Sequence, residues 1–322
     1  MGDIVIGIDL GGTKIMAAAV DGDGRILSRT FVLTAVDKGP AAVLDQMAGA
    51  AAQAAKEAGV ALADIRAIGI GSPGPLDPDE GVIIFSPNLP GWDHVPMKRH
   101  IEKAVGKPVF LDNDCNVATL AEHGLGAARG VPNVVGLFLG TGIGGGVIID
   151  HKLLRGFSKQ AGELGHVVVD VNGPKCGCGQ KGCIEALASR AAICRQVAHE
   201  LKNGRKSVVK ETDPRRMRTS LLAEALAARD DLVHDVMSRA MEHLGVAVAS
   251  IAHVVSPEMI VIGGGIIEAM NDEMLGLVQQ SAKRRALPLV MDNVKFVRGK
   301  LGEDAGVLGA AVLAREGLAG KL

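Results

Sequence analysis

The chain has 322 residues, enough for two modest domains that each bury a core of their own. Its formal net charge is −1, so the charge balance gives no support for a nucleic acid or an anionic membrane as partner. Aromatic residues make up only 2% of the chain, with one Trp and no Tyr, which argues against a surface on which bases stack.

Cysteine usage and the N-terminal segment indicate the cellular compartment of the chain. Three of its five cysteines lie close together, a pattern typical of a reducing compartment, and Cys115 and Cys194 are expected to be buried without a chemical role. No basic segment follows Met1, so we predict no signal peptide. The most apolar helical stretch, Met47–Ala63, contains charged residues and cannot span a bilayer. We therefore expect a cytoplasmic protein that does not contact a membrane.

Alternating apolar runs, glycine turns and helical spacings predict an α/β chain. The first three strands should form a meander with a glycine-rich first hairpin. The predicted strands are Ile4–Leu10, Ile15–Val20, Arg25–Leu33, Ile65–Gly71, Val109–Leu111, Val134–Leu139, Gly146–Asp150 and Met259–Ile262. The predicted helices are Pro40–Gly59, Cys115–Gly124, Leu232–Val255, Ile267–Ala282 and Ala305–Leu318. Residues 203–220 are charged and weakly periodic, which indicates a surface excursion.

The second half of the chain begins as the first half does. An apolar run, the glycine turn Gly140–Gly145 and a second apolar run repeat the opening pattern of strand, glycine hairpin and strand. The repetition indicates two related α/β halves.

Residues 162–186 hold the densest set of metal-binding side chains: His166, Cys176, Cys178 and Cys183. Three thiols and an imidazole in a short glycine-rich segment are what a closed tetrahedral zinc site requires. Disulfides are the alternative, but the segment holds three cysteines and the other two are distant. Four protein ligands leave no position for water, so the metal is expected to be structural. Glu163 and Glu185 flank the cluster, and we expect the metal to fix the loop that presents them.

Two glycine hairpins are candidate phosphate cradles made of backbone N–H groups, although a plain hairpin is the alternative for each. The second, at Gly140–Gly145, matches the dinucleotide pattern GxGxxG by letter, but an apolar strand follows it where that pattern demands a helix. The sequence contains no Walker pattern either.

Two acids follow predicted strands. Asp9 closes the first strand, where it is either a turn cap or a partner of a phosphate-bound Mg²⁺. Asp114 follows the strand Val109–Leu111 and is either the N-cap of a helix or a functional carboxylate at the carboxyl edge of a sheet.

Taken together in chain order, these motifs resemble the ROK family of bacterial sugar kinases and repressors, most of all its glucokinases. The resemblance covers essentially the whole chain. It rests on DLGGTK at Asp9–Lys14, GSPGPLD at Gly71–Asp77, PNLPGW at Pro87–Trp92, NDCN at Asn113–Asn116, GTGIGGG at Gly140–Gly146, AGELGH and CGCGQKGCIEA within 161–186, and DAGVLGAA at Asp304–Ala311. GELGH combined with CxCGxxGC is the most specific part.

The resemblance implies the actin/hexokinase-like (ribonuclease H-like) fold, in which two α/β domains flank a central cleft. The smaller domain would comprise residues 1–115 with 305–322, and the larger, with the zinc loop, residues 116–304. The implied reaction transfers phosphate from ATP, with Mg²⁺, to the 6-hydroxyl of glucose, with Asp114 as general base.

The resemblance also implies the binding residues. Those for the sugar are Gly74, Asn88, Asn113, Asp114, Glu163, His166 and Glu185. Those for the nucleotide are Asp9, Gly11, Gly12, Thr13, Lys14, Gly140, Thr141, Gly142, Gly264 and Gly265. One ring nitrogen of His166 would bind zinc and the other the sugar.

Several alternatives remain open at this stage. N-acetylmannosamine, N-acetylglucosamine and fructose kinases share these motifs, and the donor is ATP or polyphosphate. A ROK repressor would need a helix-turn-helix before the first strand at Ile4, where the sequence leaves no room for one. A sugar-responsive regulator without catalysis is a further alternative, which the presence of both Asp9 and Asp114 disfavours. A homodimer or larger homo-oligomer is expected from the family.

Overall fold

The structure, a computed structural model, describes residues 3–86, 89–268 and 272–322. The chain forms two compact units. Unit 1 comprises Met1–Pro132, Gly146–Gly162 and Glu303–Leu322, and unit 2 comprises Asn133–Gly145 and Glu163–Gly302. The domain division expected from the resemblance stays a prediction. The compact units place residues 116–132 and 146–162 in unit 1, whereas that division assigns them to the larger domain.

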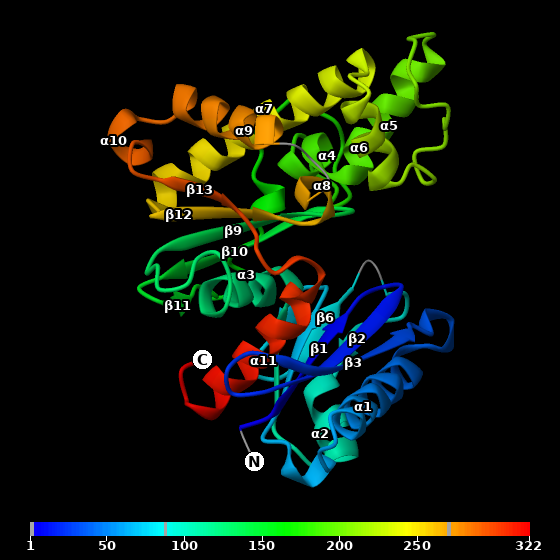
Figure 1. The fold of residues 1–322 in the computed structure, drawn as a ribbon, viewed down its shortest axis with the longest axis vertical. Helices are drawn as coiled ribbons and strands as arrows, with labels where there is room; N and C mark the ends of the chain where they lie inside the picture. The colour runs from blue at the N-terminus through cyan, green and yellow to red at the C-terminus, as the bar shows by residue number, and fades with distance from the viewer. Residues whose placement is uncertain (1–2, 87–88, 269–271) are drawn as a thin grey trace. The chain divides into compact units, whose positions relative to one another are not determined.

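Unit 1 is built on a five-stranded sheet in the order β3-β2-β1-β4-β8 (Figure 1). Its strands are β1 (Val5–Leu10), β2 (Lys14–Val20), β3 (Ile26–Leu33), β4 (Ile68–Ser72) and β8 (Val109–Asn113). Its helices are α1 (Pro40–Glu57), α2 (Met97–Val105), α3 (Asp114–Gly124) and α11 (Ala305–Leu318). The first three strands form the predicted antiparallel meander, and β4 and β8 continue the sheet in parallel to β1.

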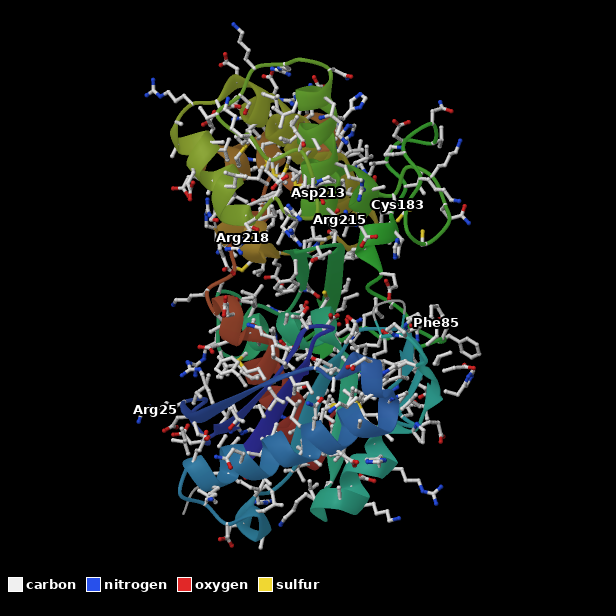
Figure 2. The ribbon with its side chains drawn as sticks, turned by 90° about the vertical axis from the view of Figure 1, so that its right-hand side faces the viewer. Arg25, Phe85, Cys183, Asp213, Arg215 and Arg218 are labelled. Atoms are coloured by element: carbon white, nitrogen blue, oxygen red, sulfur yellow. The ribbon has the colours of Figure 1, made fainter. Side chains whose placement is uncertain are left out.

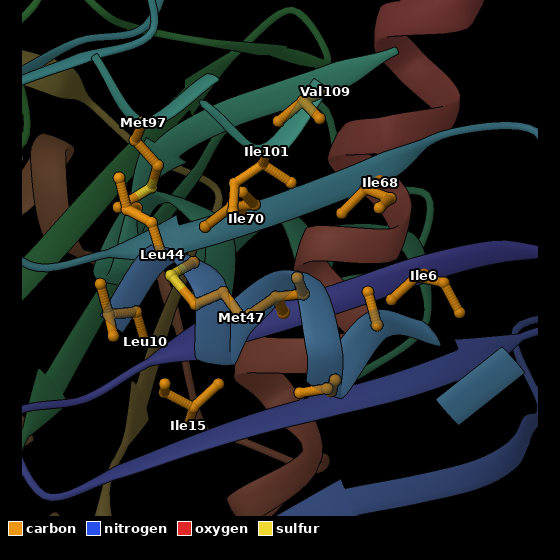
Figure 3. Packing of buried hydrophobic residues seen from close by; sticks show 14 of the residues in the cluster. Ile6, Leu10, Ile15, Leu44, Met47, Ile68, Ile70, Met97, Ile101 and Val109 are labelled. Atoms are coloured by element: carbon orange, nitrogen blue, oxygen red, sulfur yellow. The ribbon is translucent and has the colours of Figure 1, made fainter. Parts of the chain in front are cut away.

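The two faces of this sheet differ because alternate residues of a strand point to opposite sides. Ile6, Ile8 and Leu10 of β1 join the main core cluster with the apolar stripe of α1 (Figure 3). Gly7 lies on the opposite face, against α11, where a Cβ would come within 1.9 Å of the Val307 carbonyl oxygen. The absence of a side chain at this position lets the helix lie directly on the sheet. Asp9 shares that face, at the end of the strand.

Unit 2 contains the strands β9 (Val134–Leu139), β12 (Met259–Gly263) and β13 (Lys295–Arg298) and most of the remaining helices. The second sheet runs β11-β10-β9-β12-β13, with β10 at Ile143–Ile149, leaving unit 2 after Gly145, and β11 at Lys152–Leu153. Its order matches that of the first sheet, since a β-hairpin and an edge strand again precede two parallel strands. This match agrees with the two related halves predicted from the repeated pattern.

The helices of unit 2 pack largely around α7 and α9 (Figure 1). Their bounds are α4 Ile184–Ala188, α5 Arg190–Lys202, α6 Thr219–Ala227, α7 Asp231–Val255, α8 Gly265–Glu268, α9 Asp272–Arg285 and α10 Pro288–Met291. The predicted helix Ile267–Ala282 corresponds to parts of α8 and α9, and its residues 269–271 lie outside the described part of the chain. The predicted helix Leu232–Val255 is confirmed as α7.

The structure differs from the sequence prediction in three places. The glycine turn predicted to reach Gly145 ends at Gly142, because β10 already begins at Ile143. Helices α2, α4, α5, α6 and α10, the strands β11 and β13, and a small sheet of β5 (Leu76–Asp77), β6 (Val82–Phe85) and β7 (Asp93–Val95) were not anticipated. Most of the segment predicted as a surface excursion is irregular and carries the exposed ion pair Asp213–Arg215 (Figure 2), but its last two residues begin α6. None of the described helices combines the length and the apolar character needed to cross a bilayer.

Candidate active site and metal cluster

The carboxyl ends of three parallel strands meet at one edge of the first sheet. Asp9 of β1 lies opposite Gly71 of β4, and Gly71 lies opposite Asp112 of β8. Edges of this kind, outside the carboxyl ends of parallel strands, are where α/β sheets bind ligands. Asp114 begins α3 directly after β8, so the fold brings both predicted acids to this edge.

The electrostatics of Asp9 show that these acids influence each other. Burial is the main cause that raises the pKa of Asp9 to about 6, repulsion by Asp114 adds to it, and Lys14 acts in the opposite direction. The first turn of α11 covers the carboxylate, since a Cβ at Gly306 would lie 2.6 Å from Asp9 Oδ2. Two carboxylates held close together, one beside a lysine, form an acidic site suited to a cation or a proton acceptor.

Asn113, and not Asp114, is the N-cap of α3. The Asn113 side-chain oxygen accepts hydrogen bonds from the backbone N–H groups of Cys115, at 2.8 Å, and Asn116, at 3.3 Å. The alternative role of Asp114 as a helix cap is therefore wrong. Asp114 is half-buried, its Oδ1 accepts from the Cys115 N–H at 2.8 Å, and burial raises its pKa above the usual value. A carboxylate with a raised pKa at a strand-to-helix turn is a good candidate for a general base.

The first glycine hairpin joins β1 to β2 beside Asp9. Gly11 N–H donates to the Lys14 carbonyl at 2.9 Å, and Thr34 holds the hairpin from the side through bonds to Gly11 and Thr13. Gly12 and Thr13 at the tip are exposed. The Lys14 ammonium lies 3.6 Å from Glu303 in a pair that is largely exposed to solvent, so the amine can reach an anion at the tip.

The second glycine hairpin joins β9 to β10 within unit 2. Gly140 N–H donates to the Gly142 carbonyl at 2.9 Å, and a strand follows, as the apolar residues after the glycines predicted. Arg190, the first residue of α5, donates its backbone N–H to Gly140 and a guanidinium N–H to Thr141 Oγ1 at 3.0 Å. The N–H of Ile143 donates to Glu185 Oε2 at 3.1 Å. The hairpin is therefore fixed from two sides.

The structure brings together the four predicted metal ligands, His166, Cys176, Cys178 and Cys183. Their candidate ligand atoms all lie within 4.8 Å of one another. His166 Nδ1 is 3.8 Å from Cys176 Sγ, and Cys178 Sγ is 3.7 Å from Cys183 Sγ. Ligands at about 2.3 Å from one tetrahedral ion lie roughly 3.8 Å apart, so the donor set and its spacing fit such an ion. None of the five cysteines is in a disulfide.

Both glutamates predicted to flank the cluster contact its members. Glu163 Oε2 lies 3.9 Å from His166 Nε2, the ring nitrogen that is not directed at the thiols. Glu185 Oε1 lies 3.4 Å from Cys176 Sγ, while its other oxygen accepts from Ile143. Glu185 thus connects the cluster to the second glycine hairpin, a link that the sequence did not indicate. Cys183 lies in the loop before α4 (Figure 2).

The remaining predicted binding residues lie on turns. Gly264, with φ of 91°, follows β12, and a Cβ there would come within 2.5 Å of the Leu139 carbonyl oxygen, while Gly265 opens α8. Gly74, with φ of 139°, follows β4, and a Cβ there would lie 2.9 Å from the Phe85 carbonyl oxygen. Asn88 lies outside the described residues.

Three residues of these sites were not anticipated: Asp112, Arg155 and Arg190. Asp112 is buried, at 2% exposure, and pairs with Arg155. The only sequence signal for Asp112 was its place between an apolar strand and the Asn-Asp pair. The sequence contained no signal for the two arginines, because the partner of each is distant in the sequence and not part of a local motif.

The chain is similar to sugar kinases along its full length. The sequence model of the ROK family matches residues 5–317. A glucokinase of Thermotoga maritima is 37% identical over 318 residues, which are 98% of each chain. The crystal structure of a ROK hexokinase from Thermus thermophilus matches with a TM-score of 0.83 at 38% identity, covering 98% of this chain and 99% of that one.

A solved relative holds two bound ligands. The crystal structure of a ROK family glucokinase from Streptomyces griseus in complex with glucose and AMPPNP matches with a TM-score of 0.83 at 33% identity, covering 97% of this chain and 99% of that one. Xylose repressors are also among the relatives, at lower identity. These matches confirm the predicted hexokinase-like α/β fold. The chain belongs to the ROK family.

Proposed function

We propose that the chain is an ATP-dependent glucokinase that phosphorylates the 6-hydroxyl of glucose. The observation that carries the proposal is the pair Asp9 and Asp114 at one sheet edge beside a glycine hairpin. The relatives that match along the whole chain support it, since the one from Thermotoga maritima is a glucokinase and the one from Streptomyces griseus holds glucose and AMPPNP.

In this proposal Asp114 is the general base. Its carboxylate accepts the proton of the sugar hydroxyl, the hydroxyl oxygen forms a bond to the γ-phosphorus, and the bond from that phosphorus to the β,γ-bridging oxygen breaks, so that ADP leaves. Phosphoryl transfer depends mainly on positioning and charge neutralisation. The raised pKa of Asp114 makes it a better proton acceptor than an exposed carboxylate, because a base works best with a pKa near the working pH.

The nucleotide would bind through backbone groups and a few side chains. Gly12 and Thr13 offer N–H groups in unit 1, and Thr141 and Gly142 offer them in unit 2, as in other phosphate-binding turns. Gly11 and Gly140 would support these turns, because their own N–H groups close the two hairpins. Lys14 supplies a positive charge, and Gly264 and Gly265 present bare backbone to the adenosine. Mg²⁺, bound with ATP, would neutralise developing phosphate charge, and Asp9 is the residue that would hold it.

The sugar would be bound by polar side chains and by backbone groups. Besides Asp114, the proposed residues are Gly74, Asn88, Asn113, Glu163, His166 and Glu185. We assign zinc to the four-residue cluster, because three thiols and an imidazole are the donors that zinc prefers in closed structural sites. The ion would fix the loop that presents Glu163 and Glu185. His166 Nδ1 would be the zinc ligand, which leaves Nε2, beside Glu163, for the sugar.

The proposal is tested by an assay of ADP release with ATP, Mg²⁺ and a sugar panel of glucose, fructose, N-acetylglucosamine and N-acetylmannosamine. We expect glucose to give the highest kcat/KM. An Asp114→Asn variant should lose about 10²- to 10⁴-fold in kcat, the usual share of a general base. Asp37→Asn, the same change at an exposed position in unit 1, is the matched control and should keep wild-type turnover.

Three outcomes would contradict parts of this assignment. Preference for an N-acetylated hexosamine or fructose would replace the substrate but keep Asp114 as base. Near-normal turnover in Asp114→Asn would remove Asp114 from that role. Turnover of the same sugar with polyphosphate in place of ATP would change the donor.

We also propose the compartment and the oligomeric state of the enzyme. Three free thiols in one cluster fit a reducing cytoplasm, and a homodimer is expected from the family resemblance. Light scattering during size-exclusion chromatography of the purified chain would measure the assembly directly.

A further inference from the structure

The most deeply buried ion pair among the described residues includes Asp112, which is two residues before the proposed base Asp114. Arg155 Nε donates to Asp112 Oδ2 at 2.7 Å, with side-chain exposures of 14% and 3%. Arg155 follows β11 in the segment 146–162, so a residue distant in sequence reaches the end of β8 within unit 1. Neither residue belongs to the sugar or nucleotide sets proposed above.

Asp112 is held on both carboxylate oxygens. While Oδ2 accepts from Arg155, Oδ1 accepts from the backbone N–H of Asn113 at 2.8 Å and from Asn116 Nδ2 at 2.9 Å. The first bond fixes the last peptide of β8, and the second connects the Asp112 carboxylate to the first turn of α3. Together with the Asn113 cap, these bonds hold the residues that precede and follow Asp114 in the chain.

The segment that contains Arg155 is itself anchored within unit 1. The loop that follows it is anchored to the region around β5, since Gln160 Nε2 donates to the Leu76 carbonyl at 2.7 Å and Lys159 pairs with Asp79 at 2.7 Å. The guanidinium therefore approaches Asp112 from a tethered segment. Its positive charge also acts on Glu316 of α11, where it opposes the rise in pKa that burial causes.

We propose that Arg155 and Asp112 are positioning residues that hold the strand-to-helix turn on which Asn113 and the base Asp114 stand. The proposal rests on the function proposed above. A buried ion pair is a weak source of stability, because desolvation offsets most of the attraction, whereas two charges with several hydrogen bonds define an orientation. Orientation is what a general base needs, since a misplacement of about 1 Å can cost about 10²-fold in rate.

The test compares Arg155→Met with Arg155→Lys and with Arg315→Met. Arg315 is a matched control because it also lies in unit 1 and donates to backbone carbonyls of Val20 and Asp21, at the edge of the sheet opposite Asp9. For each variant we would measure kcat, the KM values for ATP and glucose, and unfolding by urea. We would also measure backbone hydrogen exchange by mass spectrometry in peptides that cover residues 112–116.

A positioning role predicts a specific pattern. Arg155→Met should lose about 30- to 300-fold in kcat while the KM for ATP changes less than about threefold, because the base and not the glycine hairpin is displaced. Arg155→Lys, which keeps the charge, should lose less than about tenfold. Exchange within 112–116 should be faster in Arg155→Met by about tenfold or more and unchanged in Arg315→Met, whose kcat should stay within about twofold of wild type.

Two outcomes would overturn the proposal. One is a folded Arg155→Met enzyme with a kcat within about threefold of wild type. The other is a loss in Arg155→Met that Arg315→Met matches at equal loss of stability, with no faster exchange in 112–116. If the wild-type chain phosphorylates no sugar, the proposed function fails by itself. The exchange comparison then still decides whether Arg155 orders the turn.

Discussion

Replacing Asp9 by Asn should stabilise the protein in the absence of ligands. The Asp9 carboxylate is partly buried, covered by the first turn of α11 and repelled by Asp114, and its pKa is raised from 3.8 to about 6. The folded state therefore disfavours the charged form that prevails at neutral pH. An amide of nearly the same shape removes this cost, and we expect the proposed Mg²⁺ role to be lost with it. Sites that bind ligands often carry such a cost.

The size and the pH window follow from the two pKa values. A rise from 3.8 to about 6 corresponds to about 3 kcal/mol, at roughly 1.4 kcal/mol for each pKa unit. Well below pH 3.8 the carboxyl group is protonated in both the folded and the unfolded chain, so Asp9 then costs nothing. The cost grows between pH 3.8 and about 6 and is complete above it. Asp9→Asn should therefore gain up to about 3 kcal/mol at pH 7.5 but only about 0.5 kcal/mol at pH 4.

Urea unfolding followed by tryptophan emission measures this difference. Trp92 is the one Trp of the chain, there is no Tyr, and its buried indole lies in unit 1 with Asp9, so the signal reports the relevant unit. Asp37→Asn, at an exposed position, is the control and should change the free energy of unfolding by less than about 0.5 kcal/mol. An Asp9→Asn variant that is no more stable than wild type at pH 7.5, or equally stabilised at pH 4, would refute the reasoning.

Two further predictions concern unit 2. Cys183→Ser removes a buried ligand and should lose the bound zinc, measured as metal content of the purified chain. Cys194→Ser, at a buried thiol outside the cluster, is the control and should keep the zinc. Zinc retained in Cys183→Ser would contradict the assignment. Glu185→Ala should raise the KM for ATP by about tenfold, because an unsatisfied Ile143 N–H costs about 1–3 kcal/mol. Glu185→Gln keeps an acceptor oxygen and should raise that KM by less than about threefold, so an equal rise in both variants would exclude the hydrogen bond as the cause.

Features that depend on residues close together in the chain could be predicted from the sequence. The meander β1-β2-β3 follows from apolar runs separated by glycine turns, and the second hairpin follows from the repetition of that pattern. The four metal ligands come from one short segment, so their residue types alone predicted that they would meet. Asp9 lies near the end of one buried strand and Asp114 directly follows another, and parallel strands bring their carboxyl ends to one edge.

Features that depend on distant partners could not be predicted. Arg155 meets Asp112 across 43 residues, and no periodicity marks either residue as half of a pair. From the sequence only Asp114 was considered as a cap of α3, but Asn113 is an equally good capping residue and is the N-cap in the structure. The second glycine turn is shorter than its letters suggested, since Gly145 lies within β10 where a Cβ would come within 2.7 Å of the Gly136 carbonyl oxygen. That glycine serves close packing and not the turn.

The two glycine hairpins are alike in sequence pattern but differ in how they are supported. Each is closed by a bond of 2.9 Å from its first glycine N–H, to Lys14 in one and to Gly142 in the other. The first carries its own charged neighbours, Asp9 and Lys14, on the strands that it joins. The second takes its support from Arg190 and Glu185, and Glu185 also contacts the cysteine cluster. A structural metal in unit 2 would therefore order more than the sugar loop, because Glu185, which contacts the proposed ligand Cys176, also fixes the hairpin proposed to bind phosphate.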